Sequence, residues 1–215
     1  MQFTHDLFDA SGDDRASRLG LTYLAGFALP FEQEMLAAIA EIAEVAPFRH
    51  MMTPGGQRMS AAMTNCGAVG WVTDRKGYRY DPVDPQTGRP WPALPACFGQ
   101  VAQRAAAAAG FEAFRPDVCL INRYAPGARM SLHQDRDERD FSAPIVSISL
   151  GLGATFLFGG LRRSDRPHRL PLAHGDVVVW GGPTRLAYHG IAPVAEGCHA
   201  AVGPMRLNLT LRQAL

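Results

Sequence analysis

The spacing of apolar and polar residues from residue 118 onward predicts a series of short strands. Apolar or alternating runs are separated by turn sequences such as Pro126-Gly127, Gly159-Gly160 and Gly181-Gly182. The predicted strands span residues 118–124, 129–137, 145–150, 155–158, 169–172, 177–180 and 206–212. Many short strands with glycine-rich turns favour a β-sandwich or jelly roll.

Two earlier segments show helical spacing instead. Residues 31–43 follow Pro30, with acidic residues in the first turn and apolar residues at helical intervals. A second helix is predicted between Pro95 and Ala109, because this stretch is rich in alanine and Gly110 suits a C-terminal cap. Both helices are expected to support a sheet.

The remaining residues divide into a tail and a loop-rich segment. Residues 1–18 show little periodicity and predict a flexible N-terminal tail, which leaves residues 19–215 as a single domain. Residues 53–92 are dense in Gly, Pro, Asp and Thr and predict hairpins and long loops. The fold class expected is mainly β (α+β), with supporting helices near the N-terminus.

Composition and charge exclude several classes of protein. The chain is 47% hydrophobic and 19% charged, as in globular proteins, and has no apolar run long enough to span a bilayer. No secretory signal is visible, no Cys-x-x-Cys pair occurs among the four cysteines, and no long apolar helix suggests a partner chain. We therefore expect a cytoplasmic monomer that has reduced thiols and does not bind membranes.

Charge leaves nucleic-acid binding open. A net charge of +1 argues against holding a polyanion mainly by long-range attraction. The cluster Arg162, Arg163, Arg166 and Arg169 suits either phosphate contacts or a solvated loop.

The first candidate for chemistry is the pair His133 and Asp135, followed further along the chain by His189. On a strand, residues two apart project to the same side, so His133 and Asp135 are able to hold one ion, with a third ligand from another strand. Two imidazoles and one carboxylate form the facial set that holds iron(II). Taken alone, a His-x-Asp pair is also common among solvated residues.

The second candidate is the strand predicted at residues 206–212. Its polar residues occupy one face and its three leucines the other, which directs Arg206 and Arg212 toward one polar cavity. Two arginines suit a dicarboxylate, whereas an edge strand with a wet face gives the same pattern. An iron triad together with paired arginines is what an oxygenase using 2-oxoglutarate requires.

Several motifs together closely resemble the bacterial AlkB oxidative DNA dealkylation enzymes, over about residues 27 to 214. These motifs are Met51-Met52-Thr53-Pro54-Gly55-Gly56, Met63-Thr64-Asn65-Cys66-Gly67, Asp84-Pro85-Gln86-Thr87-Gly88, Asn122-Arg123-Tyr124-x-Pro126-Gly127, His133-Gln134-Asp135-x-Asp137, Tyr188-His189 and Arg206-x-Asn208-x-Thr210-x-Arg212. A set of separate matches in order is far more specific than any one of them.

The resemblance implies a double-stranded β-helix (jelly roll) with a nucleotide-recognition lid in residues 53–92. It implies iron(II) bound by the three residues named above, with 2-oxoglutarate as cosubstrate and O2 as oxidant. Arg206 and Tyr124 would bind the distal carboxylate of 2-oxoglutarate, and Arg212, with Asn122 and Asn208 nearby, would serve the end close to iron.

The implied activity is oxidative demethylation of 1-methyladenine and 3-methylcytosine in DNA, with release of formaldehyde. Single strands are the expected substrate because exposing the methyl group in them costs less free energy than in a duplex, and double-stranded DNA and RNA are further candidates. Trp71 and Tyr78 match lid positions, and Arg163 matches a position near the substrate. Asp137, expected on the same strand face as His133, would favour cationic lesions.

Two other functions fit parts of the same sequence. An oxygenase acting on RNA or on a small molecule would keep the triad and the arginines, and a non-catalytic nucleic-acid-binding jelly roll would need neither.

His174, in the turn before an apolar run, is expected to be structural, with Asp176 capping that turn.

Overall fold

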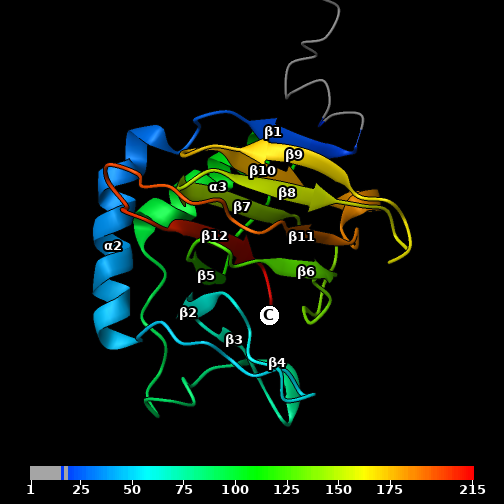
Figure 1. Cartoon of the computed structure of the whole chain (residues 1–215). Helices are drawn as coiled ribbons and strands as arrows, with labels where there is room; N and C mark the ends of the chain where they lie inside the picture. The colour runs from blue at the N-terminus through cyan, green and yellow to red at the C-terminus, as the bar shows by residue number, and fades with distance from the viewer. Residues whose placement is uncertain (1–15, 17–18) are drawn as a thin grey trace, which may run out of the picture.

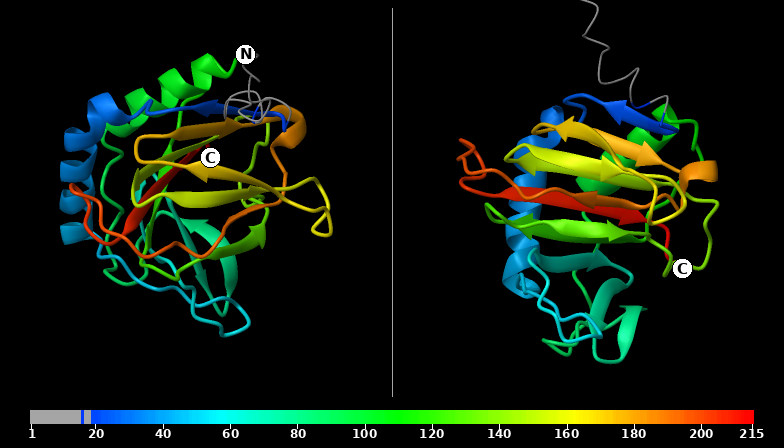
Figure 2. Two further views of the ribbon diagram at one scale, coloured as in Figure 1. Left: turned by 45° about the horizontal axis from the view of Figure 1, so that its top comes forward. Right: turned by 45° about the vertical axis from the view of Figure 1, so that its right-hand side comes forward.

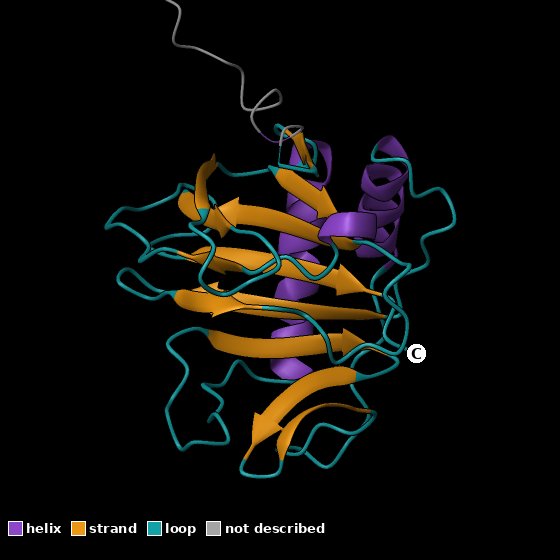
Figure 3. Cartoon of the chain, turned by 90° about the vertical axis from the view of Figure 1, so that its right-hand side faces the viewer, coloured by secondary structure: helices purple, strands orange, loops and turns teal. Residues whose placement is uncertain are grey.

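The computed structural model of this chain describes residue 16 and residues 19–215. The tail predicted over residues 1–18 therefore lies, apart from Ala16, outside the described residues. Two antiparallel sheets face each other, and the helices lie against one of them (Figures 1 and 3). This arrangement confirms the predicted mainly β jelly roll with supporting helices.

The larger sheet has six strands and the smaller one four. The order in the larger sheet is β1 (Leu21–Leu24), β10 (Val177–Trp180), β7 (Ile145–Gly151), β12 (Arg206–Arg212), β5 (Val118–Tyr124) and β2 (Ala62–Gly67). The order in the smaller sheet is β6 (Met130–His133), β11 (His189–Ile191), β8 (Ala154–Phe158) and β9 (His168–Leu172). All neighbouring strands pair antiparallel, and Figure 2 shows the layered sheets from two further directions.

The helices have the positions that their sequence spacing predicts. They are α2 (Glu32–Val45) and α3 (Ala96–Ala108), with short 3-10 turns η1 (Leu29–Phe31) and η2 (Gly182–Thr184). Gly110 follows α3 with a φ of 87°, a left-handed conformation that glycine adopts at helix ends without steric cost. No helix in residues 19–215 is long and apolar enough to cross a membrane.

The alternation along β12 divides the core into two layers. Leu207, Leu209 and Leu211 pack outward against the helices, in a cluster that includes Ile39 of α2 and Phe98 of α3. A second cluster fills the space between the two sheets and contains large aromatic residues such as Trp180 and Phe156. The polar face of β12 is directed into that second space.

The position of β12 decides between the two interpretations of its pattern. β12 pairs with β5 on one side and with β7 on the other, and all seven of its residues are buried. The alternative of an edge strand with a wet face is therefore wrong. Its two arginines are enclosed within the jelly roll, where a charge requires a partner.

The strand predicted over residues 129–137 is shorter than expected. β6 ends at His133 because its neighbour β11 begins at His189, the residue directly opposite His133, so the later residues have no backbone partner on that side. The interpretation of Asp137 as a residue on the same strand face as His133 is therefore wrong. Residues 134–138 are held by side chains instead.

The loop-rich segment predicted over residues 53–92 contains a separate two-stranded sheet, β3 (Gly70–Asp74) and β4 (Gly77–Asp81). This hairpin lies beyond β2, at the end of the larger sheet (Figure 1). The side chain of Asn65 in β2 exchanges two hydrogen bonds of 3.0 Å with the backbone of Trp71 in β3. The hairpin is thus tied to the strand that precedes it.

All four cysteines are free thiols, as predicted from their spacing. Cys66, Cys97 and Cys119 are buried, and Cys198 is exposed.

Candidate functional site

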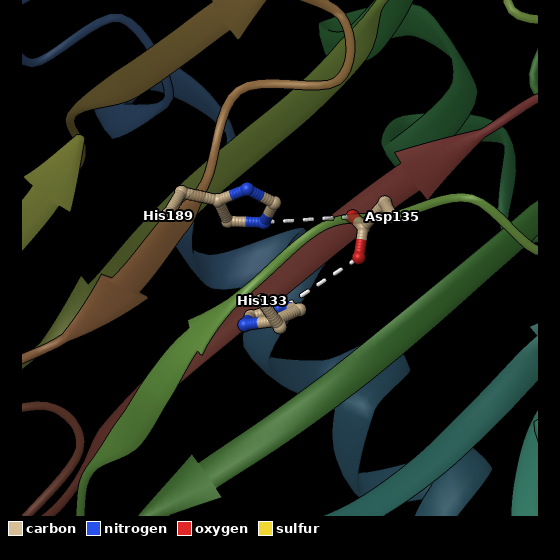
Figure 4. Close-up of side chains that lie close together, drawn as sticks. All are labelled: His133, Asp135 and His189. Carbon is tan, nitrogen blue, oxygen red and sulfur yellow. Dashed lines mark ion pairs between the residues drawn. The ribbon is translucent and has the colours of Figure 1, made fainter. Parts of the chain in front are cut away.

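Three side chains, from residues 133, 135 and 189, meet where the end of β6 lies beside the start of β11 (Figure 4). His133 ends β6, His189 begins β11 directly opposite it, and Asp135 follows β6 by two residues. Nε2 of His133 lies 3.5 Å from Oδ1 of Asp135, and Nε2 of His189 lies 3.7 Å from Oδ2. One candidate ligand atom from each residue lies within 4.8 Å of the others. The convergence predicted from the sequence is thus present.

Backbone carbonyls fix the orientation of both imidazoles. Nδ1 of His133 lies 2.9 Å from the carbonyl of Ser131, and Nδ1 of His189 lies 3.0 Å from that of Ala187. Because a carbonyl only accepts hydrogen bonds, Nδ1 carries the proton in each ring and Nε2 keeps its lone pair. Both lone pairs therefore lie on the side of Asp135, as metal ligation requires.

The charges of the three residues also suit a divalent cation. Burial, together with the nearby charge of His133, lowers the pKa of His189 to about 4, so His189 is neutral near pH 7. Burial opposes ionisation of Asp135, but the charge of Arg212 and the two histidines hold the pKa of its carboxyl well below the usual value. For His133, burial lowers the pKa, but the hydrogen bond and charge of Asp135 outweigh it and raise the pKa. Two nitrogen donors and one carboxylate match the facial set for iron(II).

Two buried arginines lie next to this cluster. Arg212 donates from Nη2 to Oδ2 of Asp135 at 2.6 Å, and Arg206 donates from Nη2 to Ser149 Oγ at 3.0 Å. The guanidinium of Arg206 also lies over the ring of Tyr124, 5.2 Å from its centroid. Burial raises the pKa of Tyr124 to about 12, so its hydroxyl remains protonated and able to donate. The polar face of β12, together with Tyr124 of the neighbouring β5, thus presents two cations and a phenol.

Several polar atoms of this face are buried without a hydrogen-bond partner among the described residues. They are Nε and Nη1 of Arg206, Nη1 of Arg212 and Oδ1 of Asn122. Unpaired donors on a buried cation cost free energy that a bound anion would recover. Asn208 differs, since its amide donates to Ser147 and to the carbonyl of Ile148. The unpaired donors fit a dicarboxylate bound beside the histidines.

Comparison with known proteins identifies this combination of fold and site. A family model described as 2OG-Fe(II) oxygenase superfamily matches residues 20–212. The alpha-ketoglutarate-dependent dioxygenase AlkB of Escherichia coli (strain K12) is 56% identical over 210 residues, 97% of each chain. The chain belongs to the AlkB family of 2OG-Fe(II) oxygenases. It is an iron(II)- and 2-oxoglutarate-dependent dioxygenase that uses O2.

Other AlkB-type proteins support the same assignment. The nucleic acid dioxygenase ALKBH1 of Homo sapiens is 35% identical over 124 residues, which are 58% of this chain and 32% of that protein. The solved structure of OsALKBH1 superimposes with a TM-score of 0.78 at 28% identity and covers 90% of this chain and 98% of that one. AlkB-type enzymes act on nucleic acids, and the paired sheets described above are the frame of this family.

Two of the residues predicted for the substrate, Trp71 and Tyr78, lie on the β3–β4 hairpin. The rings of Trp71 and Tyr78, on the facing strands of the hairpin, stack with centroids 5.7 Å apart and planes 18° apart. Nε1 of Trp71 donates to Oδ2 of Asp137 at 2.8 Å. Asp137 is thus connected to the hairpin by a side-chain hydrogen bond, although it does not share a strand face with His133.

Arg163 is the predicted substrate residue on the other side. It is exposed in the loop between β8 and β9, and its guanidinium lies 5.5 Å from the ring centroid of Tyr188. Tyr188 immediately precedes His189, and its backbone bonds with Gly159 and Gly160 tie this loop to the metal cluster.

Glu138 and Arg185 are two buried residues of the site that sequence analysis did not single out. Arg185 donates from Nη1 to the backbone carbonyl of Asp135 at 2.8 Å, and its Nη2 lies 3.2 Å from Oε2 of Glu138. Gln134 adds a hydrogen bond of 2.7 Å to the carbonyl of Leu186. These contacts hold the segment that carries Asp135. An acidic residue among charged neighbours gives no sequence signal of burial, because Glu is mostly exposed.

His174 and Asp176 have the structural roles predicted for them. Nδ1 of His174 accepts a hydrogen bond of 2.8 Å from the backbone of Gly151, and Asp176 accepts one of 2.7 Å from the hydroxyl of Tyr23. Asp176 also accepts from the backbone of Ala173, within the predicted turn.

Proposed function

We propose that this enzyme removes methyl groups from the Watson–Crick nitrogens of damaged bases, such as 1-methyladenine and 3-methylcytosine in DNA. The observation that supports this proposal most strongly is the enclosure of the histidine–aspartate cluster and the unpaired arginine donors within one jelly roll, beside a pair of stacked aromatic rings. The histidine–aspartate cluster suits iron(II), the arginine donors suit 2-oxoglutarate, and the stacked rings suit a base. A binding module without catalysis would need only the third.

The residues that would hold iron(II) are His133, Asp135 and His189. When bound, iron(II) with 2-oxoglutarate and O2 supplies the oxidation that converts the methyl group to a hydroxymethyl group, which leaves as formaldehyde. The histidines contribute their Nε2 lone pairs, and Asp135 contributes a carboxylate kept ionised by Arg212. The remaining residues of the site bind, orient and enclose the cosubstrate and the base.

Arg206 and Tyr124 would bind the distal carboxylate of 2-oxoglutarate. Arg206 is 0% exposed and already has one of its nitrogens on Ser149, so its position is fixed and its Nε and Nη1 remain as donors. Charge-assisted hydrogen bonds from a preorganised guanidinium lose little entropy on binding. Arg212, with Asn122 and Asn208 nearby, would meet the end of the cosubstrate that lies near the metal.

The base would enter between the hairpin and the metal cluster. A methyl group on a Watson–Crick nitrogen is hidden in a duplex, so the base must leave its stack. Trp71 and Tyr78 present aromatic faces for stacking, and the side chain of His133, 38% exposed, is the most open member of the cluster. Asp137 would favour cationic bases, and Arg163 would contact the flanking strand.

Single-stranded DNA is the substrate we propose, because extracting its bases requires no base pairs to be broken. Double-stranded DNA and RNA are secondary substrates in this proposal. We also propose that residues 19–215 act as one monomeric domain in the cytoplasm. The four free thiols, typical of reducing compartments, support that location.

The proposal is tested by mass spectrometry of a single-stranded oligonucleotide that contains one 1-methyladenine. The oligonucleotide is incubated with the enzyme, iron(II), 2-oxoglutarate and O2, and succinate is quantified in parallel. We expect the loss of one CH2 unit together with an equal amount of succinate. His133→Ala should abolish both products.

The same assay separates the rival functions. Succinate without demethylation of DNA, together with turnover of a methylated RNA or small molecule, would replace the proposed substrate. Oligonucleotide binding without either product, from a folded and iron-loaded enzyme, would support a binding module instead.

A further inference from the structure

Glu138 is an acidic residue enclosed by donors from three different parts of the chain. Its side chain is 1% exposed. Oε1 accepts a hydrogen bond of 2.6 Å from the hydroxyl of Tyr80 and lies 3.3 Å from Nε of Arg212, while Oε2 lies 3.2 Å from Nη2 of Arg185. Tyr80 gives the hydrogen bond to Glu138, and the two arginines are ion-pair partners, since Oε2 accepts no hydrogen bond among the described residues. A buried carboxylate without such partners would be costly, so these three contacts hold Glu138 in place.

Two of these donors also hold the metal ligand Asp135. Arg212 bonds to its carboxylate, and Arg185 bonds to its backbone carbonyl. Asp135 and Glu138 therefore share two buried arginines, with two negative and two positive charges in one cluster. A change in the position of Glu138 would be transmitted to the guanidinium of Arg212 and, through both arginines, to Asp135.

The third donor belongs to the hairpin. Tyr80 lies on β4 and faces Trp71 on β3 in the register of the hairpin. Trp71 bonds to Asp137, and Tyr80 bonds to Glu138, so both strands of the hairpin are attached to consecutive residues of the segment that carries Asp135. The hairpin that presents the stacked rings is thus attached, through Glu138, to Arg212.

We propose that Glu138 is a positioning residue through which docking of a nucleic acid on the hairpin sets Arg212 for the carboxylate of 2-oxoglutarate. The inference rests on the proposed role of Arg212. Nη1 of Arg212 is the nitrogen that has no hydrogen-bond partner within the described part of the chain, and Glu138 lies at the opposite, Nε edge of the same planar group. Holding one edge of a guanidinium fixes the direction of the other.

The proposal predicts a coupling free energy between two ligands. A methylated oligonucleotide on the hairpin should tighten the binding of 2-oxoglutarate, and by linkage 2-oxoglutarate should tighten the binding of the oligonucleotide by the same factor. Tyr80→Phe keeps the ring but removes the hydroxyl that donates to Glu138. It should therefore remove the coupling, which is measured as the ratio of the 2-oxoglutarate Kd with and without the oligonucleotide.

The test measures the Kd of 2-oxoglutarate by calorimetry, with redox-inactive Mn(II) in place of iron, with and without a single-stranded oligonucleotide that contains 1-methyladenine. We expect the oligonucleotide to lower this Kd by about 5-fold or more in the unmodified enzyme and by less than about 2-fold in Tyr80→Phe. Glu138→Gln, which keeps the shape and removes the charge, should weaken 2-oxoglutarate binding even without the oligonucleotide.

Tyr23→Phe is the matched control. Like Tyr80→Phe, it removes a partly buried hydrogen bond from a tyrosine hydroxyl to a carboxylate, here 2.7 Å long and to Asp176, which is not one of the three residues of the metal cluster. Its coupling should equal that of the unmodified enzyme, and its melting temperature shows how much a bond of this kind contributes to stability. Circular dichroism confirms that each variant is folded.

Three outcomes overturn the proposal. These are equal coupling in Tyr80→Phe and Tyr23→Phe, unchanged 2-oxoglutarate affinity in Glu138→Gln, or no coupling in an unmodified enzyme that demethylates its substrate. The last result would refute the coupling and leave the proposed function intact. If Arg212→Met also binds 2-oxoglutarate as tightly as the unmodified enzyme, the proposed role of Arg212 fails first.

Discussion

Arg212 donates two hydrogen bonds to the same oxygen of Asp135, from Nε at 3.0 Å and from Nη2 at 2.6 Å. The other carboxylate oxygen of Asp135 lies 3.5 Å from His133. A residue of the candidate metal site is thereby paired with a residue of the candidate cosubstrate site, although 77 positions separate them in the sequence. The two sites share one buried ion pair, so changes in one are expected to affect the other.

Asp135→Asn should lower the affinity for iron(II) or Mn(II) by more than about 100-fold. The substitution keeps the shape but removes the negative charge of the ligand, and it leaves Arg212 buried without its anion. Metal titration with bound Mn(II) detected by electron paramagnetic resonance measures the change. Asp140→Asn is the control and should have no effect, because within the described residues the hydrogen bonds of that exposed carboxylate are to Ser142. Equal losses in both variants would contradict the assignment.

Arg206→Met should weaken 2-oxoglutarate binding by at least about 30-fold, because it removes a buried charge that would pair with the distal carboxylate. The same variant should be as stable as the unmodified protein or more so when no cosubstrate is present, since it removes unpaired buried donors. Calorimetric melting with and without 2-oxoglutarate checks both statements. A variant whose melting temperature still rises with 2-oxoglutarate as in the unmodified protein would refute the role of Arg206.

Asp137→Asn should reduce kcat/KM for 1-methyladenine by about 10-fold more than kcat/KM for the neutral base 1-methylguanine. The amide still offers an oxygen to Nε1 of Trp71, so the contact with the hairpin is kept while the negative charge is lost. Parallel turnover measurements on two otherwise identical oligonucleotides give the ratio. If both substrates slow by the same factor, Asp137 supports the hairpin and does not select charge.

The strands were predictable where alternation is imposed by two packed faces. Residues 118–124, 177–180 and 206–212 have the predicted bounds because each lies within the larger sheet and its side chains divide between the two core clusters. β1 (LTYL) and β11 (HGI) were not predicted, since neither is a continuous apolar run such as VVVW of β10 and neither shows an alternation of apolar and polar residues. Their pairing partners are distant in sequence, and only the closed sheets reveal them.

The candidate site was predictable in its ligands and less so in their support. His133, Asp135 and His189 have residue types and spacing that limit the chemistry, and the alternation along residues 206–212 adds the two arginines. The positions of Glu138 and Arg185 follow from contacts with residues 42 or more positions away in the sequence, which no local pattern indicates. Side chains replace strand pairing in residues 134–138, and no propensity signals that replacement.

Metal binding at pH 6 should release about one proton per ion. The pKa of His133 is raised, so it is largely protonated at that pH and must lose its proton to bind, whereas His189, with a pKa of about 4, and Asp135 are already deprotonated. Affinity should therefore fall about 10-fold per pH unit below the pKa of His133 and level off above it. Calorimetry of Mn(II) binding in buffers of different ionisation enthalpy counts the protons. Release of two would show that His189 is also protonated and would contradict the burial of its ring as the cause of its low pKa.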